Sequence, residues 1–272
     1  MVDYSPALMT DMYEYTMLDA SLKDGTANRK CVFEVYTRHL PEGRRYGVVA
    51  GIGRILDELG RFLLSDEDLR FLSDRKVVSK ETISWLENLH FSGSIKGYRE
   101  GEMFFPNSPI LQVEGTFGEC TLLETLVLSV LNYDSAVASA ASRMVSAAKD
   151  RPCMDMGGRR TNEWAAVAAA RAAVIGGFQG TANLLAAQLY GLKAIGTAAM
   201  VVPLTFAAAP YVARMVESSI KEVPFGVIEA AQSMGASPWQ IVWKVLVPEA
   251  KPSLMVGGAI SIVTILGYSA MA

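Results

Sequence analysis

The stretch CMDMGGRRTNEWAAVAAARAAVIGGFQGTANLLAAQLYGLKAIGT, residues 153–197, decides the fold of the first part of the chain. It opens with a short apolar run that predicts a strand at Cys153 to Met156, followed by a helical segment from Asn162 to Ile175 and a glycine-rich turn. A second helix at Ala182 to Tyr190 and a second strand at Ala194 to Thr197 follow. Because strands that alternate with helices pair in parallel, this stretch predicts the opening of a parallel α/β barrel or sheet.

The preceding residues, 1–150, predict a separate α+β amino-terminal domain. Short apolar runs predict strands at Cys31 to Tyr36, at Ile110 to Val113 and around Phe104, in a small sheet. Apolar residues three and four positions apart, with capping residues before them, predict helices between these strands. These helices cover Gly51 to Phe62, Asp66 to Leu72 and Ser79 to Leu89, and a further helix begins at Ser5-Pro6. The segment from Glu119 to Ala148 consists of good helix formers and predicts one or two helices.

The composition excludes several classes of protein. The chain has 272 residues and a formal net charge of -3, so it lacks the basic field that attracts nucleic acid. Its three cysteines, at positions 31, 120 and 153, lack paired spacing, and only two histidines could join them. We therefore expect a reducing compartment and no metal site. The first residues lack the basic start and unbroken apolar core of a secretory signal, which predicts a cytoplasmic protein.

The distribution of charge changes near residue 200. Residues 1–199 carry 21 Lys and Arg and 24 Asp and Glu, whereas residues 200–272 carry four of each. The last 20 residues, Ser253 to Ala272, have no charge and are long enough to cross a bilayer. Ala194 to Ala213 is also uncharged, but one glycine and two prolines interrupt it, so its hydropathy is ambiguous. The carboxy-terminal segment, 200–272, is therefore predicted to be all-α and of membrane type.

Three short motifs in the first part could carry chemistry. Thr10 to Thr16 is a polar and aromatic cluster that either caps a half-buried helix or faces a ligand. Arg159 and Arg160 follow two glycines between a strand and a helix, where they could fork onto a carboxylate or phosphate or remain a solvated pair. Gly176 to Thr181 resembles a phosphate-binding turn only loosely, because it lacks the lysine of a P-loop.

The order of these and other motifs resembles that of nicotinate phosphoribosyltransferases over nearly all of residues 5–199. The matching landmarks are Thr10 to Met17 (TDMYEYTM), Cys31 to Glu34 (CVFE), Leu40 to Gly43 (LPEG), Gly47 to Gly51 (GVVAG), Asp155 to Arg160 (DMGGRR), Ala168 to Gly177 (AAARAAVIGG), Gly180 to Asn183 (GTAN) and Gly196-Thr197. The resemblance identifies residues 151–199 as the first β/α units of an incomplete type II phosphoribosyltransferase barrel.

The resemblance implies an activity and roles for particular residues. The family joins nicotinate to 5-phosphoribosyl-1-pyrophosphate, in NAD salvage, and couples this step to ATP hydrolysis with Mg2+. By position, Tyr13 would flank the nicotinate ring, Arg159 or Arg160 would meet its carboxylate, and Thr197 would line the same pocket. Family members form homodimers that share this pocket between subunits.

One departure from the family pattern concerns catalysis. The family places a phosphorylated histidine directly after its Gly-Thr-x-Ala run, and here Met200 follows Gly196 to Ala199. A thioether cannot act as the nucleophile that accepts a phosphoryl group. About eight strands close such a barrel, and this part offers about two. We therefore assign no catalytic residue and expect the chain to be inactive.

Residues 200–272 resemble a different family, the permease subunits of ABC importers of the methionine-uptake type. The matching residues are Glu229, Ala230 and Ala231, then Gly235, then Val245 to Pro248, within a loop at about 229–248. The pattern predicts a short helix, a glycine turn, a second helix from Ser237-Pro238 and an exit marked by the proline. The resemblance implies that Glu229, Ala230, Ala231 and Gly235 dock on an ABC ATPase subunit, between membrane spans at 201–213 and 253–272.

Three interpretations follow from these two resemblances. The chain descends from a nicotinate phosphoribosyltransferase, or it is a permease fragment, or two gene fragments were joined by misassembly, recombination or artificial generation. A helical hairpin of no special function is the alternative to the docking loop.

Overall fold

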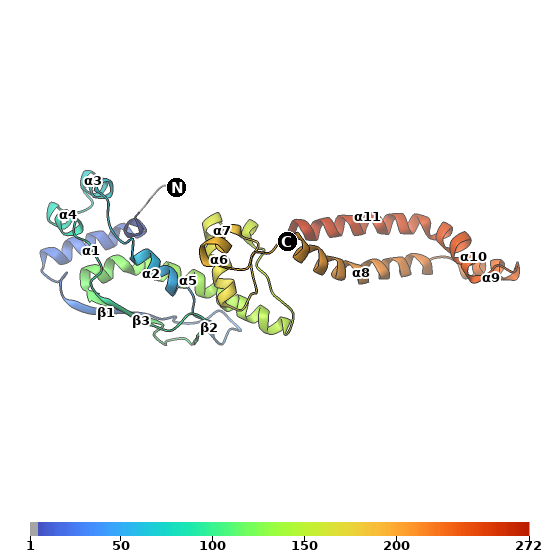
Figure 1. Cartoon of the computed structure of the whole chain (residues 1–272), viewed down its shortest axis with the longest axis horizontal. Coiled ribbons are helices and arrows are strands. Elements are labelled where there is room, and N and C mark those ends of the chain that lie inside the picture. The colour runs from blue at the N-terminus through green and yellow to red at the C-terminus, as the bar shows by residue number, and fades with distance from the viewer. Residues whose placement is uncertain (1–4, 272) are drawn as a thin grey trace. The chain divides into compact units, whose positions relative to one another are not determined.

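A computed structural model describes the backbone of residues 5–271 and the side chains of that range outside 197–204, 207 and 265–271. The chain divides into two compact units, unit 1 (Met1–Ala194) and unit 2 (Ile195–Ala272). Figure 1 draws the whole chain, with unit 1 coloured from blue to yellow and unit 2 from orange to red.

Unit 1 contains two small antiparallel sheets. The larger has the order β1 (Lys30–Val35), β5 (Leu111–Thr116), β3 (Ser94–Gly97), with Phe33 opposite Val113 in the register. The smaller pairs β2 (Gly47–Val48) with β4 (Met103–Phe104). The strands predicted near residues 31–36, 104 and 110–113 are thus confirmed, and β3 was not predicted because its sequence SIKG has little apolar character.

One long helix, α5 (Phe117–Ala148), forms the centre of unit 1. Thr116 and Glu119 form a reciprocal capping box at its start, which satisfies backbone donors of the first turn. Its apolar face joins a core that includes Leu18, Leu86 and Leu111. Figure 1 shows α5 between the larger sheet and helix α1 (Met12–Lys23), and of the one or two helices predicted for this segment the structure has one.

The remaining helices of unit 1 follow the predicted order. They are η1 (Pro6–Leu8), α2 (Ile52–Leu59), α3 (Asp66–Asp74), α4 (Lys80–Leu86), η2 (Gly158–Arg160), α6 (Glu163–Ile175) and α7 (Leu184–Tyr190). The helix predicted from Ser5-Pro6 needs correction, because the Ser5 hydroxyl accepts from the amide of Ala7 and closes only a 3-10 turn. The α-helix itself begins at Met12.

The predicted parallel β/α stretch is present in reduced form. Isolated parallel bridges join Asp155 to Thr181 and Thr181 to Ala194. The Thr181 amide donates to the Lys193 carbonyl at 3.0 Å. The strand predicted at 194–197 is therefore wrong in extent, because helix α8 already begins at Thr197. Thr181 lies in the glycine-rich segment that was predicted to be a turn, and it is fully buried between its two neighbours.

Unit 2 is helical. It consists of α8 (Thr197–Lys221), α9 (Phe225–Ser233), α10 (Pro238–Ile241), the π-helical turn η3 (Val242–Leu246) and α11 (Val247–Met271). Helices α8 and α11 pack against each other, and α8 runs without a break through Pro203 and Pro210. The expectation that these prolines interrupt the segment is therefore wrong. Each proline still lacks a backbone donor and crowds the carbonyl four residues before it, and the helix continues past both.

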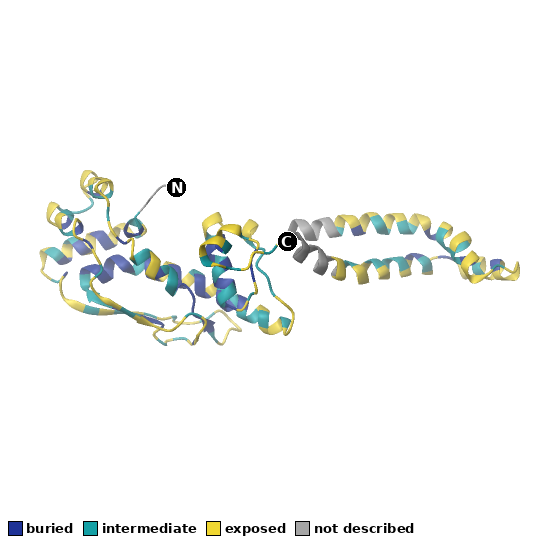
Figure 2. Cartoon of the chain, viewed as in Figure 1, coloured by how far each residue is buried: buried dark blue, intermediate teal, exposed yellow. Residues whose placement is uncertain are grey.

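One helical stretch among the described residues, Pro238–Thr264, is long and apolar enough to cross a membrane by length and composition. Figure 2 shows that most described side chains of α8 and α11 are exposed or half-buried. Pro248 does not mark an exit from the helical loop, as was predicted, because it lies at the second residue of α11.

The residue that ends α5 gives a test of backbone strain. Lys149 has φ 56° and ψ -117°, a conformation that L-residues rarely adopt. Replacing Lys149 with Gly should raise the free energy of unfolding by about 1 kcal/mol, because glycine adopts this conformation without a Cβ clash. Urea unfolding measures the change, and Lys149→Ala, which keeps the Cβ, is the matched control. Equal stability of the Gly and Ala variants would show that the strain is absent.

Candidate functional site

Tyr13 lines a cleft of unit 1. It is the second residue of α1 and is 51% exposed. The cleft has a volume of about 810 Å³, and its wall is formed by α1, the segment after β1 and one face of α5. Polar and aromatic side chains along it include Tyr36, His39, Arg44 and Asn132. The arrangement offers an aromatic face and hydrogen-bonding groups to a small polar ligand.

Glu14, the next residue, anchors this end of α1 to α5. Its carboxylate is fully buried and accepts hydrogen bonds from the hydroxyls of Thr10 and Thr125. Burial raises the pKa of Glu14 to about 7, and the nearby carboxylates of Glu124 and Asp11 add to the effect. The motif that contains Tyr13 therefore has a structural half as well as an exposed half.

The segment GVVAG, residues 47–51, is held along α5 by serine hydroxyls. The Val48 amide donates to Ser139 Oγ at 2.8 Å, and Ser135 Oγ both accepts from the Ala50 amide and donates to the Ala50 carbonyl. Gly51 has φ 106°, and a Cβ there would lie 3.0 Å from Val130 Cγ1. The left-handed backbone and the close approach to α5 both favour glycine at this position.

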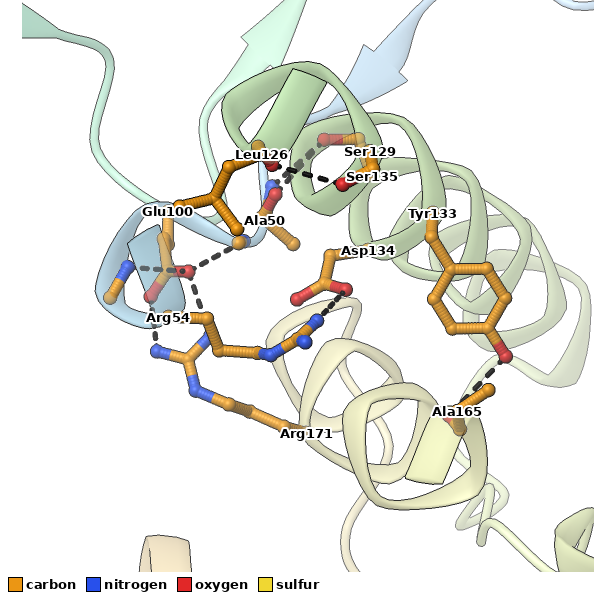
Figure 3. Close-up of polar contacts among 12 residues, drawn as sticks. Ala50, Arg54, Glu100, Leu126, Ser129, Tyr133, Asp134, Ser135, Ala165 and Arg171 are labelled. Carbon is orange, nitrogen blue, oxygen red and sulfur yellow. Dashed lines mark hydrogen bonds and ion pairs between the residues drawn. The ribbon is translucent and has the colours of Figure 1, made fainter. Parts of the chain in front are cut away.

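Two ion pairs lie beside this segment. One joins α6 to the segment between β3 and β4, because Nη1 and Nη2 of Arg171 donate to the two carboxylate oxygens of Glu100 at 2.7 Å. The other joins α2 to α5, because Arg54 Nη1 donates to Asp134 Oδ1 at 2.7 Å. Figure 3 shows Arg54 and Arg171 lying close together, with Glu100 and Asp134 as their partners. Glu100 also accepts from the Gly51 amide at 2.7 Å, so the network fixes the start of α2 as well.

Asp134 is the most enclosed member of this network. It is fully buried, and its Oδ2 atom has no hydrogen-bond partner among the described residues. Burial raises its pKa to about 6, and Arg54 opposes this shift only in part. The Arg54–Asp134 pair thus holds α2 against α5 through charges that the sequence pattern did not identify.

Arg159 and Arg160 lie in η2, directly before α6, and both are exposed. The turn before them is fixed by Asp155, which accepts from the Gly157 amide at 3.0 Å and from Thr181 Oγ1 at 2.7 Å. Neither arginine is among the residues that line the cleft of Tyr13. Their predicted role stays a prediction.

Thr197 and Met200 belong to α8 of unit 2, and their side chains lie outside the described ones. The structure therefore does not bring Tyr13, the arginines and Thr197 together as one pocket within the described residues. Asn132 of α5 also lines the cleft, although no motif in the sequence selected it.

The residues of the predicted docking loop form a helix, a turn and a second helix. Ala231 is buried, whereas Glu229 and Ala230 on the same helix, α9, are exposed. Gly235 has φ 78° and turns the chain, and Ser237 then forms a capping box with Gln240 at the start of α10. The predicted local geometry is confirmed up to α10, while the docking role stays a prediction.

The described residues contain no group of three or more His, Cys, Asp or Glu that could hold a metal ion. The acidic residues of unit 1 are instead used in ion pairs and helix caps, as Asp134, Glu100 and Glu119 show.

The buried carboxyl of Glu14 predicts how stability depends on pH. Its pKa in the folded state, about 7, is above its usual value, so its contribution is complete below about pH 4.5 and is lost as pH rises through 7. Glu14→Gln keeps the shape and removes the titration, so urea unfolding of this variant should depend less on pH between 5 and 7.5 than that of the parent chain. Glu87→Gln, at an exposed position, should match the parent. An unchanged pH dependence in Glu14→Gln would contradict the assignment.

Two family descriptions match separate parts of the chain. Residues 8–132 match the nicotinate phosphoribosyltransferase (NAPRTase) N-terminal domain, and residues 165–272 match the binding-protein-dependent transport system inner membrane component. The second match begins within α6, although residues 155, 181 and 194 are bridged to one another in unit 1. These contacts place residues 165–194 with the first part.

Individual relatives support that placement. A nicotinate phosphoribosyltransferase of Mycobacterium tuberculosis is 56% identical over 192 residues, which are 71% of this chain and 42% of the relative. The nicotinate phosphoribosyltransferase of Bacillus subtilis is 36% identical over 196 residues, 72% of this chain and 40% of that protein. An alignment of 192 residues extends well beyond residue 165 wherever it begins.

A solved structure shows the same resemblance in three dimensions. Human nicotinic acid phosphoribosyltransferase superposes with a TM-score of 0.65 at 31% identity, covering 69% of this chain and 39% of the human one. The chain thus spans about two fifths of the length of the proteins it matches. It joins a segment similar to the amino-terminal part of nicotinate phosphoribosyltransferases to a segment similar to the inner membrane component of binding-protein-dependent transport systems.

Proposed function

We propose that residues up to about 199 provide the amino-terminal part of a nicotinate phosphoribosyltransferase site. The proposal rests on the 56% identity to the Mycobacterium tuberculosis enzyme over a part of the chain in which Tyr13 lines a cleft of about 810 Å³. The reaction of that site would join nicotinate to 5-phosphoribosyl-1-pyrophosphate to give nicotinate mononucleotide, in NAD salvage.

The chemistry of the proposed residues suits this substrate. Nicotinate is a flat aromatic ring with a carboxylate, and Tyr13 offers an exposed aromatic face on which such a ring can stack. Arg159 or Arg160 would bind the carboxylate with two parallel N–H donors. Thr197 would line the same pocket. A homodimer in which the second copy completes this pocket is part of the proposal, because the arginines lie outside the Tyr13 cleft of one copy.

The residues present do not fit the ATP-dependent step of this reaction. Met200 stands where the family has its phosphorylated histidine. The thioether sulfur of methionine cannot act as the nucleophile that accepts a phosphoryl group. The described residues also provide no cluster of metal ligands for Mg2+. We therefore derive no step through ATP or Mg2+ and propose that this chain binds nicotinate without turning it over.

Binding can be measured directly by isothermal titration calorimetry of the full chain with nicotinate. We expect a dissociation constant in the millimolar range, and Tyr13→Ala should weaken binding about 3- to 10-fold, the range expected for loss of one aromatic contact. Tyr98→Ala, at a half-exposed tyrosine outside the cleft, should bind as the parent does. If the titration shows no heat of binding at millimolar nicotinate, the proposal is wrong.

The lack of turnover is a separate prediction. The full chain with nicotinate, 5-phosphoribosyl-1-pyrophosphate, ATP and Mg2+ should form no nicotinate mononucleotide above the rate without protein. Met200→His should not restore it, because one histidine does not supply the missing barrel strands. Chromatography of the products measures this, and nucleotide formed by either chain would contradict the prediction.

A second candidate function is supported by the match of residues 165–272 to a transport inner membrane component. In this proposal Glu229, Ala230, Ala231 and Gly235 contact the ATPase subunit of an importer of the methionine type, as a helix-in-groove contact. The exposed face of α9 and the turn at Gly235 supply a suitable shape. Chimeric origin, with two gene fragments joined near residue 200, accounts for both proposals in one chain.

A further inference from the structure

Two cysteines that are far apart in the sequence lie next to each other in unit 1. Cys31 is the second residue of β1, and Cys120 is the fourth residue of α5. In the register of the larger sheet, Cys31 is opposite Gly115 of β5. A Cβ added at Gly115 would lie 3.2 Å from Cys120 Sγ. The glycine therefore leaves room for the Cys120 sulfur directly beside the backbone that faces Cys31.

Both cysteine side chains lie on the core side of the larger sheet. Residues of β1 are alternately exposed and half-buried, and Cys31 shares the half-buried, core-facing side with Phe33. Phe33 contacts Phe117 in the first turn of α5, with ring centroids 6.2 Å apart. The Cys31 thiol is close enough to the Cys120 thiol for the two to interact directly. Two thiols therefore meet where β1 packs against the start of α5.

The two cysteines differ in exposure. Cys120 is buried, and burial raises the pKa of its thiol to about 12. Cys31 is half-buried, so a small oxidant reaches its sulfur first. Cys120 also lines a cavity of about 180 Å³ with Phe33, Val113 and Val127. This cavity gives the Cys120 side chain space to rotate away from the Val113 carbonyl, which lies 3.8 Å from its sulfur.

We propose that Cys31 and Cys120 form a reversible disulfide bond when the protein is exposed to hydrogen peroxide. The Cys31 thiolate attacks one peroxide oxygen, the O–O bond breaks, and Cys31 becomes a sulfenic acid while hydroxide leaves. The Cys120 thiol then loses its proton as its sulfur attacks the Cys31 sulfur, and the S–O bond breaks. The protons of the two thiols convert the two departing hydroxides to water. Two thiols are thus oxidised by two electrons, and one peroxide is reduced to two water molecules.

The disulfide bond ties the edge strand β1 to the helix at the centre of unit 1. It closes a long loop that contains α2, α3, α4 and β3, and closing a loop restricts the unfolded chain. Oxidation should therefore make unit 1 more resistant to unfolding. A reducing compartment returns the pair to thiols, so the bond persists there only while oxidant is present. Neither cysteine lines the cleft of Tyr13, so bond formation does not depend on whether unit 1 binds nicotinate.

Peptide mapping of the full chain tests the bond. The chain is purified with reductant, exposed to hydrogen peroxide after the reductant is removed, alkylated, and digested with trypsin from the monomer band of a non-reducing gel. Lysine and arginine residues separate the three cysteines, so each cysteine falls in its own tryptic peptide. We expect a linked pair of peptides that contains Cys31 and Cys120 and that dithiothreitol separates. Absence of this pair, or linked pairs with Cys153 in equal yield, would overturn the proposal.

Two matched variants test the effect of the bond on stability, which near-UV circular dichroism of the full chain follows during heating. Peroxide should raise the Tm of the parent chain and of Cys153→Ser by about 5 to 10 °C relative to peroxide-treated Cys31→Ser, because only Cys31→Ser cannot close the loop. Methionine oxidation affects all three chains alike, so the difference between them reports the bond. Without peroxide, Cys31→Ser should melt close to the parent, because its position is half-buried. Equal Tm values of the three peroxide-treated chains would contradict the proposal.

Discussion

Unit 1 depends on the packing of its other elements against α5. This helix buries one face against the larger sheet and α1, binds residues 48–50 through the hydroxyls of Ser135 and Ser139, and holds α2 through Asp134. Strand β2 has only two residues, so its pairing with β4 leaves backbone amides and carbonyls of the segment before α2 without a partner in the sheet. The serine hydroxyls supply the missing partners, which a buried backbone requires.

Packing against α5 also separates the roles of two adjacent residues at the start of α1, the buried Glu14 and the exposed Tyr13. Glu14 is fixed between Thr10 and Thr125, and the neighbouring Tyr13 is then held at the rim of the cleft. Glu100 and Arg171 play the equivalent role on the other side of α5, where they join the start of α2 to α6. The exposed Tyr13 is thus positioned by the buried Glu14 beside it, and a buried carboxyl is costly unless it is paired.

Much of the fold could be predicted from local patterns. The cap at Ser79, the alternation in β1 and the helix-forming residues of α5 are properties of nearby residues, and each gave the correct element. Thr181 could not be predicted, because a glycine-rich segment becomes extended only when strands on both sides bind it. The path of α8 through Pro203 and Pro210 was missed because the cost of proline depends on whether water competes for the free carbonyls.

The candidate site was predictable only in part for a similar reason. Tyr13 could be selected because its motif matches a family, but the cleft around it is lined by residues from α1, α5 and the segment after β1. Asn132 and Arg44 are far from Tyr13 in the sequence, so no local pattern connects them. The pairing of Arg54 with Asp134 likewise joins positions 80 residues apart.

Helix α8 continues through residues 199 and 200, where the proposed junction of the two gene fragments lies. A helix satisfies its backbone hydrogen bonds within a few residues of its own chain, so unrelated sequences can meet inside it without a defect. The phase of the helix is still continuous through the junction. Each residue turns the helix by about 100°, so adding one residue there would turn the residues before the junction relative to the helix face that carries Met215, which packs at Gly257. The number of residues at such a junction therefore decides which side chains share one face of the helix, even where the two sequences have no common history.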